Sequence, residues 1–444
     1  MVPWAKPRYE LLLLVLVAAA ALSPVQRLDS EDDSRMCQTA AFVHLRITAD
    51  TCLGHGTGLA TIDRSFYGGH YYATVAPGMA ALAIPAYEAI QLPPISKWHT
   101  FDLRLWFVRA VTAGAFFILG AFLVGRVAEG LAPGFGAPTL VTFALGTLAS
   151  SFAAANFDHV PAMTLGFAAF LLLWSRRPLA AGLVTGLALL VEYEELPVMI
   201  ALGAYALWLG IPSLRRYAAG VVPGAALLGA YDWAAFGAPW RNPLPYSTYT
   251  LNAEHSKGLL VTNLPNLHAT RLVFVGDRGL LLTSPVLVLA AAGLVLVWRR
   301  GLRAEALVCA AVAGALVLAE CGYFDPYGGL SPGPRYVIPA LAFLAVGLGP
   351  AFHRWPRLTI AAAAASVVAQ TTLLLTWSVA GGYPGTVWTQ IVHMLRHHAN
   401  SLLFDSLVSN VLVWLGPDKL TAAIVVCALS AAAFVVAVSA PYRR

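Results

Sequence analysis

Two adjacent stretches near the start of the chain decide the fold: Leu11 to Val25 (LLLLVLVAAAALSPV) and Asp29 to Gln38 (DSEDDSRMCQ). The first is an apolar run of the kind that enters a membrane, and the second places four acidic residues within five positions directly after it. Ser30 and Asp33 have the spacing of a capping box, so a short amphipathic helix is predicted to begin there. Capping accounts for only one or two of the four acids. Carboxylates at the mouth of a span are not stabilised by lipid, so the other acids need a different explanation.

The composition extends the membrane interpretation to the whole chain. Of 444 residues, 59% are hydrophobic and 11% are charged, and the mean hydropathy is +0.70. Apolar runs broken by Gly and Pro favour helices over barrel strands. The net charge of +6 comes from basic residues in short turns, a pattern that sets topology rather than nucleic-acid binding. The sequence contains no Walker-type loop, CxxC pair or HExxH motif, which argues against cytosolic nucleotide chemistry.

The runs predict an all-α polytopic membrane protein that forms a single domain over residues 1–444, with no separate soluble domain. The first run also fits a cleaved signal peptide, although an uncleaved first helix agrees better with the alternation of charges along the chain. About twelve spans are expected, at residues 9–25, 105–125, 136–156, 159–174, 178–193, 196–211, 217–235, 279–298, 304–322, 335–352, 358–380 and 419–439.

Basic residues predict how these spans are oriented in a plasma or inner membrane. Pairs such as Arg176 with Arg177 and Arg215 with Arg216 fall at alternate connections, so that face and both termini are expected in the cytoplasm. The acidic residues gather at the opposite, extracytoplasmic face. Residues 77–92 on that face are apolar but short, which is typical of an interfacial or re-entrant helix. The long connections on that face are 27–104, 236–278, 323–334 and 381–418.

Cys37 and Cys52 both lie in the first long connection, on the side of the membrane where disulfides persist. A bond between them would fix the acidic helix in place. The sequence leaves open whether they pair.

Four polar clusters converge on the outer face in this topology. The first is the acidic helix with Arg35. The second is Asp158 with His159, which is either a solvated hairpin turn or a functional pair, and the third is residues 192–195 (EYEE), for which a solvated turn is favoured. The fourth is residues 323–336 (YFDPYGGLSPGPRY), where glycines and prolines force a turn with accessible backbone N–H groups.

Two arginines stand where an outer turn meets the next predicted helix. Arg335 ends the fourth cluster, and Arg278 lies in the sequence Gly-Asp-Arg-Gly. An arginine there suits a phosphate group, although an interfacial arginine that reaches lipid headgroups is the alternative. A carboxylate base and arginines for a departing lipid phosphate are the requirements of sugar transfer from a polyprenyl-phosphate carrier.

These motifs resemble the GT-C superfamily of integral-membrane glycosyltransferases, in particular the family-39-like bacterial transferases that include the aminoarabinose and protein mannosyl enzymes. Residues 32–36 (DDSRM) are similar to that group's Asp-Glu-Thr-Arg-Tyr pattern after the first helix. Asp158 stands where the group carries a second acid, and Tyr71 with Tyr72 resembles its aromatic stretch before the second span. Residues 327–336 look like a segment common in uncharacterised actinobacterial members.

The resemblance covers roughly residues 1–380. It implies a GT-C-like bundle that transfers a sugar, with inversion, from a polyprenyl-phosphate donor to a hydroxyl on a lipid, glycan or protein of the cell envelope. Asp32 would be the general base, and Asp33 and Asp158 would orient the acceptor or the base, or hold a divalent cation. No other cofactor is implied. Asp29 and Glu31 are then left as capping or solvated groups.

The sequence departs from the family pattern at residues 75–76, where Val and Ala replace an expected Lys, and Met36 replaces a Tyr. The lipid phosphate would then have to be bound by Arg278, Arg335 or Arg271. No C-terminal periplasmic domain is expected. Further contacts with substrate or lipid phosphate are expected from Arg35, His159, Tyr71, Tyr72 and Tyr327.

A transporter or lipid flippase is the rival prediction, because twelve spans with both termini inside are also common in that class. Against it, no two halves of the chain look alike, and the predicted spans hold few ionisable residues. A transferase-like scaffold without activity is a third alternative.

Overall fold

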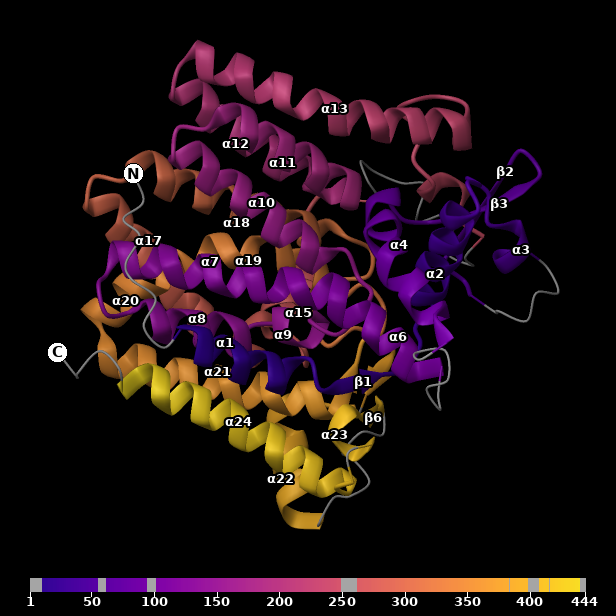
Figure 1. Cartoon of the computed structure of the whole chain (residues 1–444). Helices are drawn as coiled ribbons and strands as arrows, with labels where there is room; N and C mark the ends of the chain where they lie inside the picture. The colour runs from indigo at the N-terminus through magenta and orange to yellow at the C-terminus, as the bar shows by residue number, and fades with distance from the viewer. Residues whose placement is uncertain are drawn as a thin grey trace.

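The structure, a computed structural model, describes residues 10–54, 61–93, 101–248, 262–382, 384–397, 407–414 and 416–439. The described helices pack side by side into one bundle, and the elements of the first long connection gather at the right-hand end in Figure 1. Both chain ends lie outside the described residues, so the cytoplasmic location of the termini stays a prediction.

Each predicted span coincides with a helix or with consecutive helices. The first half of the bundle consists of α1 (Glu10–Ala21), α6 (Phe101–Arg109), η1 (Ala110–Gly114), α7 (Ala115–Leu131), α8 (Gly136–Gly146), α9 (Ala149–Phe152), α10 (His159–Trp174), α11 (Pro178–Val191), η2 (Tyr193–Glu195), α12 (Leu196–Trp208) and α13 (Ile211–Phe236). The second half consists of η3 (Leu244–Tyr246), α15 (Leu267–Val275), α16 (Leu280–Thr283), α17 (Val286–Arg299), α18 (Arg303–Gly322), η4 (Arg335–Val337), α19 (Ile338–Ala345), α20 (Leu348–Arg354), α21 (Pro356–Thr376), α22 (Val387–His397), α23 (Val411–Trp414) and α24 (Lys419–Ser439).

The described helices include four that are long and apolar enough to cross a membrane, or up to six when two bent pairs each count as one span. The bent pairs are α15–α16 with α17 and η4–α19 with α20. Other predicted spans correspond to apolar helices of 10–17 residues, such as α10 and α11. The chain therefore has membrane-spanning helices, and the count of about twelve stays a prediction.

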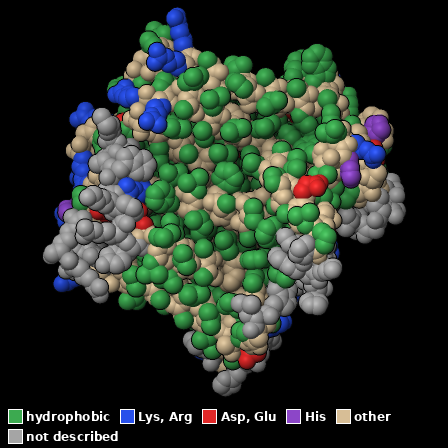
Figure 2. Space-filling view, in the orientation of Figure 1, with side chains coloured by type: hydrophobic (Ala, Val, Ile, Leu, Met, Phe, Trp, Pro, Cys, Tyr) green, Lys and Arg blue, Asp and Glu red, His purple; other side chains and the backbone are tan. Residues whose placement is uncertain are grey.

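The outer surface of the bundle agrees with a membrane location. Figure 2 shows hydrophobic side chains over most of this face, with Lys and Arg side chains gathered toward its left-hand edge. Exposed apolar residues on the bundle include Leu183, Leu227, Val295 and Leu318. A soluble protein rarely exposes so extended an apolar surface, whereas lipid chains cover it at no cost.

The first long connection folds into α2 (Ser30–Val43), α3 (Asp50–Leu53), the hairpin of β2 (Arg64–Tyr67) and β3 (His70–Ala73), and α4 (Pro77–Gln91). The helices predicted after Ser30 and at 77–92 are both present, and α4 packs against α2. A disulfide joins Cys37 of α2 to Cys52 of α3, which answers the question that the sequence left open.

The prediction of an all-α fold is correct for the bundle and incomplete for its edge. The described residues form three two-stranded antiparallel sheets: β2–β3, β1 (Pro24–Gln26) with β6 (Leu407–Asn410), and β4 (Trp377–Ser378) with β5 (Gly381–Gly382). The β1–β6 pair joins residues nearly the whole chain apart. Short strands of this kind depend on tertiary pairing rather than on local pattern, which explains why no periodicity revealed them.

Glycines allow α11 and α13 to cross closely. Gly182 and Gly186 on α11 and Gly220 and Gly224 on α13 each repeat with a spacing of four residues, as in helix pairs that pack through small residues in membranes. A Cβ at Gly224 would overlap the backbone of Gly186. The close crossing holds α11 in place, and the end of α11 carries part of the polar site.

Candidate active site

Helix α2 begins at a cap that differs from the predicted one by one residue. Asp29 is the N-cap: its side chain accepts a hydrogen bond from the N–H of Glu31 at 2.9 Å, and Asp32 Oδ2 accepts one from the N–H of Asp29 at 3.2 Å. The predicted box of Ser30 and Asp33 is therefore replaced by Asp29 and Asp32. Capping by Asp29 itself is confirmed.

Asp32 and Arg109 form a fully buried ion pair between α2 and α6. Arg109 also donates hydrogen bonds to the carbonyl oxygens of Gln26, at 2.8 Å, and Arg27, at 3.1 Å. Asp32 Oδ1 accepts a hydrogen bond from the N–H of Asn156 at 3.3 Å. The carboxylate predicted as the general base is thus held among backbone groups and one guanidinium, and that role stays a prediction.

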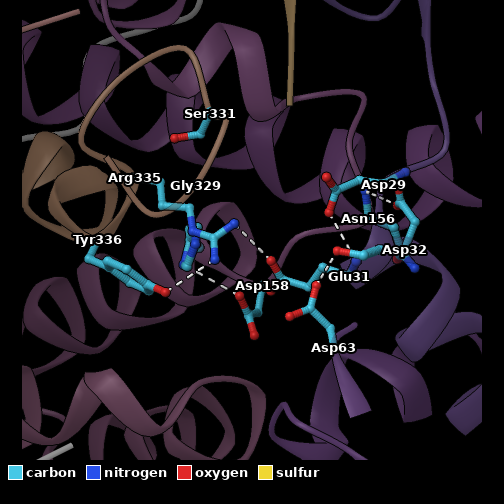
Figure 3. Close-up of polar contacts among 12 residues, drawn as sticks. Asp29, Glu31, Asp32, Asp63, Asn156, Asp158, Gly329, Ser331, Arg335 and Tyr336 are labelled. Carbon is cyan, nitrogen blue, oxygen red and sulfur yellow. Dashed lines mark hydrogen bonds and ion pairs between the residues drawn. The ribbon is translucent and has the colours of Figure 1, made fainter. Parts of the chain in front are cut away.

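Glu31, one residue earlier, points toward Arg335 (Figure 3) and forms ion pairs with two arginines. Its Oε1 is 2.6 Å from Arg35 Nη2, and its Oε2 is 2.8 Å from Arg335 Nη1. Arg35 Nη2 also lies 2.6 Å from Asp158 Oδ2. The interpretation of Glu31 as a capping or solvated group is wrong, because the i, i+4 spacing places it beside Arg35 and the bundle brings Arg335 to its other oxygen.

The ion pairs border a polar cavity of about 90 Å³, called the central cavity below. Arg335 enters it from the turn before α19, and Tyr336 accepts a hydrogen bond from Arg335 Nη2 at 3.1 Å. Arg335 Nε is buried and donates to no described residue. The cavity is lined by Glu31, Asp63, Thr74, Val75, Ala76, Asp158, His159, Tyr193, Glu194, Leu244, Ser247, Tyr323, Arg335 and Tyr336.

Asp63 reaches the cavity from the loop before β2. In the described residues its carboxylate accepts a hydrogen bond from the hydroxyl of Ser30, and it forms no ion pair with an arginine. Glu31 and Asp158 also reach the cavity, but each lies against a guanidinium. Asp63 and Glu194 are therefore the lining carboxylates that form no ion pair with an arginine among the described residues.

The hairpin at residues 192–195 is buried rather than solvated. Glu192 is 1% exposed and Glu195 is 0% exposed, so the favoured prediction of a solvated turn is wrong. His159 Nδ1 lies 2.6 Å from Glu192 Oε1, so the second and third polar clusters meet. The end of α11 lies beside the start of α10 at this point, which turns the hairpin inward.

Burial and charge shift the acids of α2 in different directions. Burial opposes ionisation of Glu31, but the guanidiniums of Arg335 and Arg35 outweigh it and hold the pKa of Glu31 below its usual value. Burial, with Asp32 and Glu31 nearby, raises the pKa of Asp29 to about 7.

Two other acids near the cavity shift upward. Burial, with Asp32 nearby, raises the pKa of Asp33 to about 6. Burial raises the pKa of Asp63 as well, and the charge of Glu31 adds to the effect. A raised pKa makes Asp63 a stronger base once it is ionised.

Arg278 and Arg271 lie in a different cavity, of about 420 Å³. Arg278 stacks between the rings of Tyr327, at 4.1 Å, and Trp377, at 4.9 Å, and donates a hydrogen bond to the carbonyl of Ser331. Tyr327 lines this second cavity and not the central one. The structure therefore separates the three arginines that the sequence grouped as phosphate ligands.

The aromatic pair of the first long connection supports the hairpin. Tyr72 is buried against Phe236, with ring centroids 5.1 Å apart, and the guanidinium of Arg64 lies over Tyr71 at 5.0 Å. Neither tyrosine lines the central cavity. Residues 74–76, directly after them, line it instead, so the position of the missing Lys faces the cavity with apolar side chains.

Sequence reasoning missed Arg109, Glu31 and Asp63 as parts of the site. Arg109 carried a usable signal, because a charged residue within a predicted span is a functional candidate by default. Asp63 lies in a loop that carried no recognised pattern.

An apolar groove of about 520 Å³ lies between α12 and α18 and shares Glu194, Tyr323 and Tyr336 with the central cavity. Most of its lining is aliphatic, including Ile200, Ala315 and Leu316. A second groove, of about 770 Å³, lies across α17, α18 and α19 and is apolar throughout. The first groove thus joins an apolar surface to the polar cavity.

No model of a protein family matches the sequence, and no curated protein matches it significantly. Among solved structures, ArnT from Cupriavidus metallidurans in the apo state matches with a TM-score of 0.54. The chain has an ArnT-like fold. The structure of the same protein bound to undecaprenyl phosphate matches with a TM-score of 0.50. Each match has 14% sequence identity and covers 97% of this chain, and 75% and 76% of the respective ArnT chains. The expected architecture is confirmed as an ArnT-like fold.

Proposed function

We propose that the chain is a GT-C-type glycosyltransferase that moves a sugar from a polyprenyl-phosphate donor to a hydroxyl acceptor on the extracytoplasmic side of the inner membrane. The observation that carries the proposal is the apolar groove between α12 and α18, which opens into a cavity that contains Arg335 and several carboxylates. The fold it shares with ArnT, one structure of which holds undecaprenyl phosphate, supports the same class.

Arg335 is suited to the donor phosphate. It lies at the junction of the groove and the cavity, next to Tyr336, which lines both. Its Nε retains a hydrogen that no described residue accepts. A phosphate needs such a donor as charge develops on the leaving oxygen. Arg278 and Arg271, in the separate cavity, are proposed as contacts for a phosphate or headgroup outside the reaction centre.

The reaction needs one base. The acceptor oxygen attacks the anomeric carbon, the bond from that carbon to the phosphate oxygen breaks, and polyprenyl phosphate leaves with the electron pair. The hydroxyl proton passes to a carboxylate, and direct displacement inverts the anomeric centre. Asp63 is proposed as the base, because it lines the cavity without an ion pair to an arginine among the described residues and is oriented by the hydroxyl of Ser30. Glu194 also lines the cavity without such a pair and is the alternative base. Asp32 can act as the base only if its pair with Arg109 opens.

The proposal is tested with purified full-length chain in detergent, given radiolabelled sugars on polyprenyl phosphate and a panel of hydroxyl acceptors. Transfer that is lost in Arg335→Gln and retained in Arg241→Gln supports it; Arg241 lies outside the cavity lining and pairs with Tyr67. In parallel, proteoliposomes are assayed for uptake and lipid scrambling. Movement of lipid or solute across the bilayer without transfer would replace the proposal with a flippase or transporter.

A further inference from the structure

Asp158, His159 and Glu192 form a compact group at the edge of the central cavity. One ligand atom of each, a carboxylate oxygen or an imidazole nitrogen, lies within 4.8 Å of the other two. His159 Nδ1 is 2.6 Å from Glu192 Oε1 and 3.4 Å from Asp158 Oδ1. The residues come from the start of α10 and the end of α11, so two packed helices hold the group.

Each member is more than nine-tenths buried and keeps a polar atom that no described residue satisfies. These atoms are Asp158 Oδ1, Glu192 Oε2 and His159 Nε2, which make no hydrogen bond with any described residue. Buried oxygens of this kind are costly unless a proton or a cation compensates them. The unsatisfied oxygen of Asp158 faces His159, toward the centre of the group.

Acidic side chains around the group outnumber basic ones, and an added cation would stabilise their ionised form. Carboxylates of Glu31, Asp63 and Glu194 line the same cavity as Asp158 and His159. Two guanidiniums face them: Arg35 contacts Asp158 and Glu31, and Arg335 contacts Glu31. With Asp158 and Glu192 included, the acids outnumber these guanidiniums. The position therefore favours an added cation.

We propose that Asp158, His159 and Glu192 bind one divalent transition-metal ion of the type of Zn²⁺ or Mn²⁺. A nitrogen ligand favours such ions over Mg²⁺ and Ca²⁺, which prefer oxygen throughout. Ligands about 2.1 Å from a tetrahedral ion lie about 3.4 Å apart, which is the separation of Asp158 Oδ1 and His159 Nδ1. The shorter contact of His159 Nδ1 with Glu192 Oε1, 2.6 Å, is a hydrogen bond that the ion would replace. Arg35 holds the other oxygen of Asp158 and so orients the ligand.

Three protein ligands leave a coordination position open, as in metal sites that bind substrate. Asp158 and His159 line the central cavity, so the open position faces it. A hydroxyl or a phosphate oxygen in the cavity would occupy that position. The metal site rests on the geometry of its ligands alone and stands whether or not the chain transfers a sugar.

The test is metal binding by the full-length chain in detergent, stripped with EDTA and titrated with Zn²⁺ and Mn²⁺ by calorimetry and with Co²⁺ by visible absorption. The expected result is one equivalent per chain and a Co²⁺ d–d spectrum of an ion with mixed nitrogen and oxygen ligands. Glu192→Gln and His159→Gln, which keep side-chain size and a hydrogen-bonding group, are expected to weaken binding at least tenfold.

Two matched controls separate the site from incidental binding. Glu88→Gln neutralises an exposed acid on α4 outside the cavity lining, and His353→Ala removes an exposed histidine elsewhere; both are expected to bind as the wild type does. Wild-type protein that binds no stoichiometric metal overturns the proposal. So does unchanged binding in Glu192→Gln or His159→Gln. If either variant does not fold, the wild-type titration and Co²⁺ spectrum decide.

Discussion

At the scale of single residues, Asp32 is predicted from the sequence as the catalytic base, and in the structure it forms a buried ion pair with Arg109. Replacing Asp32 by Asn leaves the Arg109 guanidinium buried without a negative partner. We expect Asp32→Asn to destabilise the protein by about 3 to 5 kcal/mol, measured as a fall in unfolding temperature in detergent. Asp277→Asn, at an exposed position without an ion pair among the described residues, is the control and is expected to change stability by about 0.5 kcal/mol or less.

An Asp32→Asn protein with wild-type unfolding temperature and no transfer would contradict this structural role. That outcome would return the role of base to Asp32.

Asp63 gives the complementary prediction. Its carboxylate lines the central cavity and contacts Ser30 rather than an arginine, so Asp63→Asn removes a base without exposing a buried cation. We expect transfer to slow by about 10² to 10⁴-fold, with the unfolding temperature and donor binding unchanged. Asp50→Asn is the matched control, because Asp50 pairs with His70 outside the cavity. Full activity in Asp63→Asn would exclude Asp63 as the base.

At the scale of elements, the contribution of the α2 N-terminus to the stability of the fold is expected to depend on pH. The pKa of Asp29 is about 7 in the folded protein against 3.8 as the reference. An acid whose folded pKa is raised stabilises the fold most below its unfolded pKa, and this contribution is lost as the pH rises from about 4 to about 7. Asp29→Asn keeps a capping side chain and removes this titration.

The measurement compares unfolding temperatures of wild type and Asp29→Asn at pH 5 and at pH 7.5. The unfolding temperature of the variant, relative to that of the wild type, is expected to increase between pH 5 and pH 7.5. A constant difference between the two proteins would show that Asp29 does not titrate in this range.

The disulfide is the second device that fixes α2. Cys37 and Cys52 are separated by 15 residues and join α2 to α3. Closing a loop of this size stabilises a fold by about 3 kcal/mol. We expect Cys37→Ser with Cys52→Ser to lower the unfolding temperature, and dithiothreitol to lower that of the wild type but not of the double variant. Equal sensitivity of both proteins to the reductant would contradict a bond between these cysteines.

At the scale of the whole molecule, the close packing of α11 against α13 holds in place the end of α11, which carries Glu192 into the polar site. A Cβ at Gly224 overlaps the backbone of Gly186, whereas a Cβ at Gly314 of α18 meets nothing within 4 Å. We expect Gly224→Ala to destabilise the fold by about 1 to 3 kcal/mol, and Gly314→Ala to leave stability unchanged or slightly increased. The prediction is checked by measuring the unfolding temperatures of both variants. Equal values would mean that α11 and α13 can move apart without loss of stability.

The sequence was sufficient for the helices and for the outer polar face, because apolar runs and turn residues report on local structure. It was insufficient to predict which polar residues are buried. Residues 192–195 looked like a solvated turn, yet the position of α11 turns them into the protein. Glu31 and Asp32 are neighbours in one helix turn, and only the placement of Arg109 and Arg335 separates their environments. Such choices depend on contacts between residues far apart in the chain.

The link from Glu31 to Arg335 has a consequence for turnover. An anionic donor that reaches Arg335 meets a guanidinium already engaged by a carboxylate, so binding is an exchange of anions rather than a simple addition. Glu31 would act as an internal competitor that admits the donor and then helps to expel polyprenyl phosphate. Glu31→Gln is accordingly expected to bind polyprenyl phosphate more tightly and to release it more slowly, so that product inhibition limits the rate.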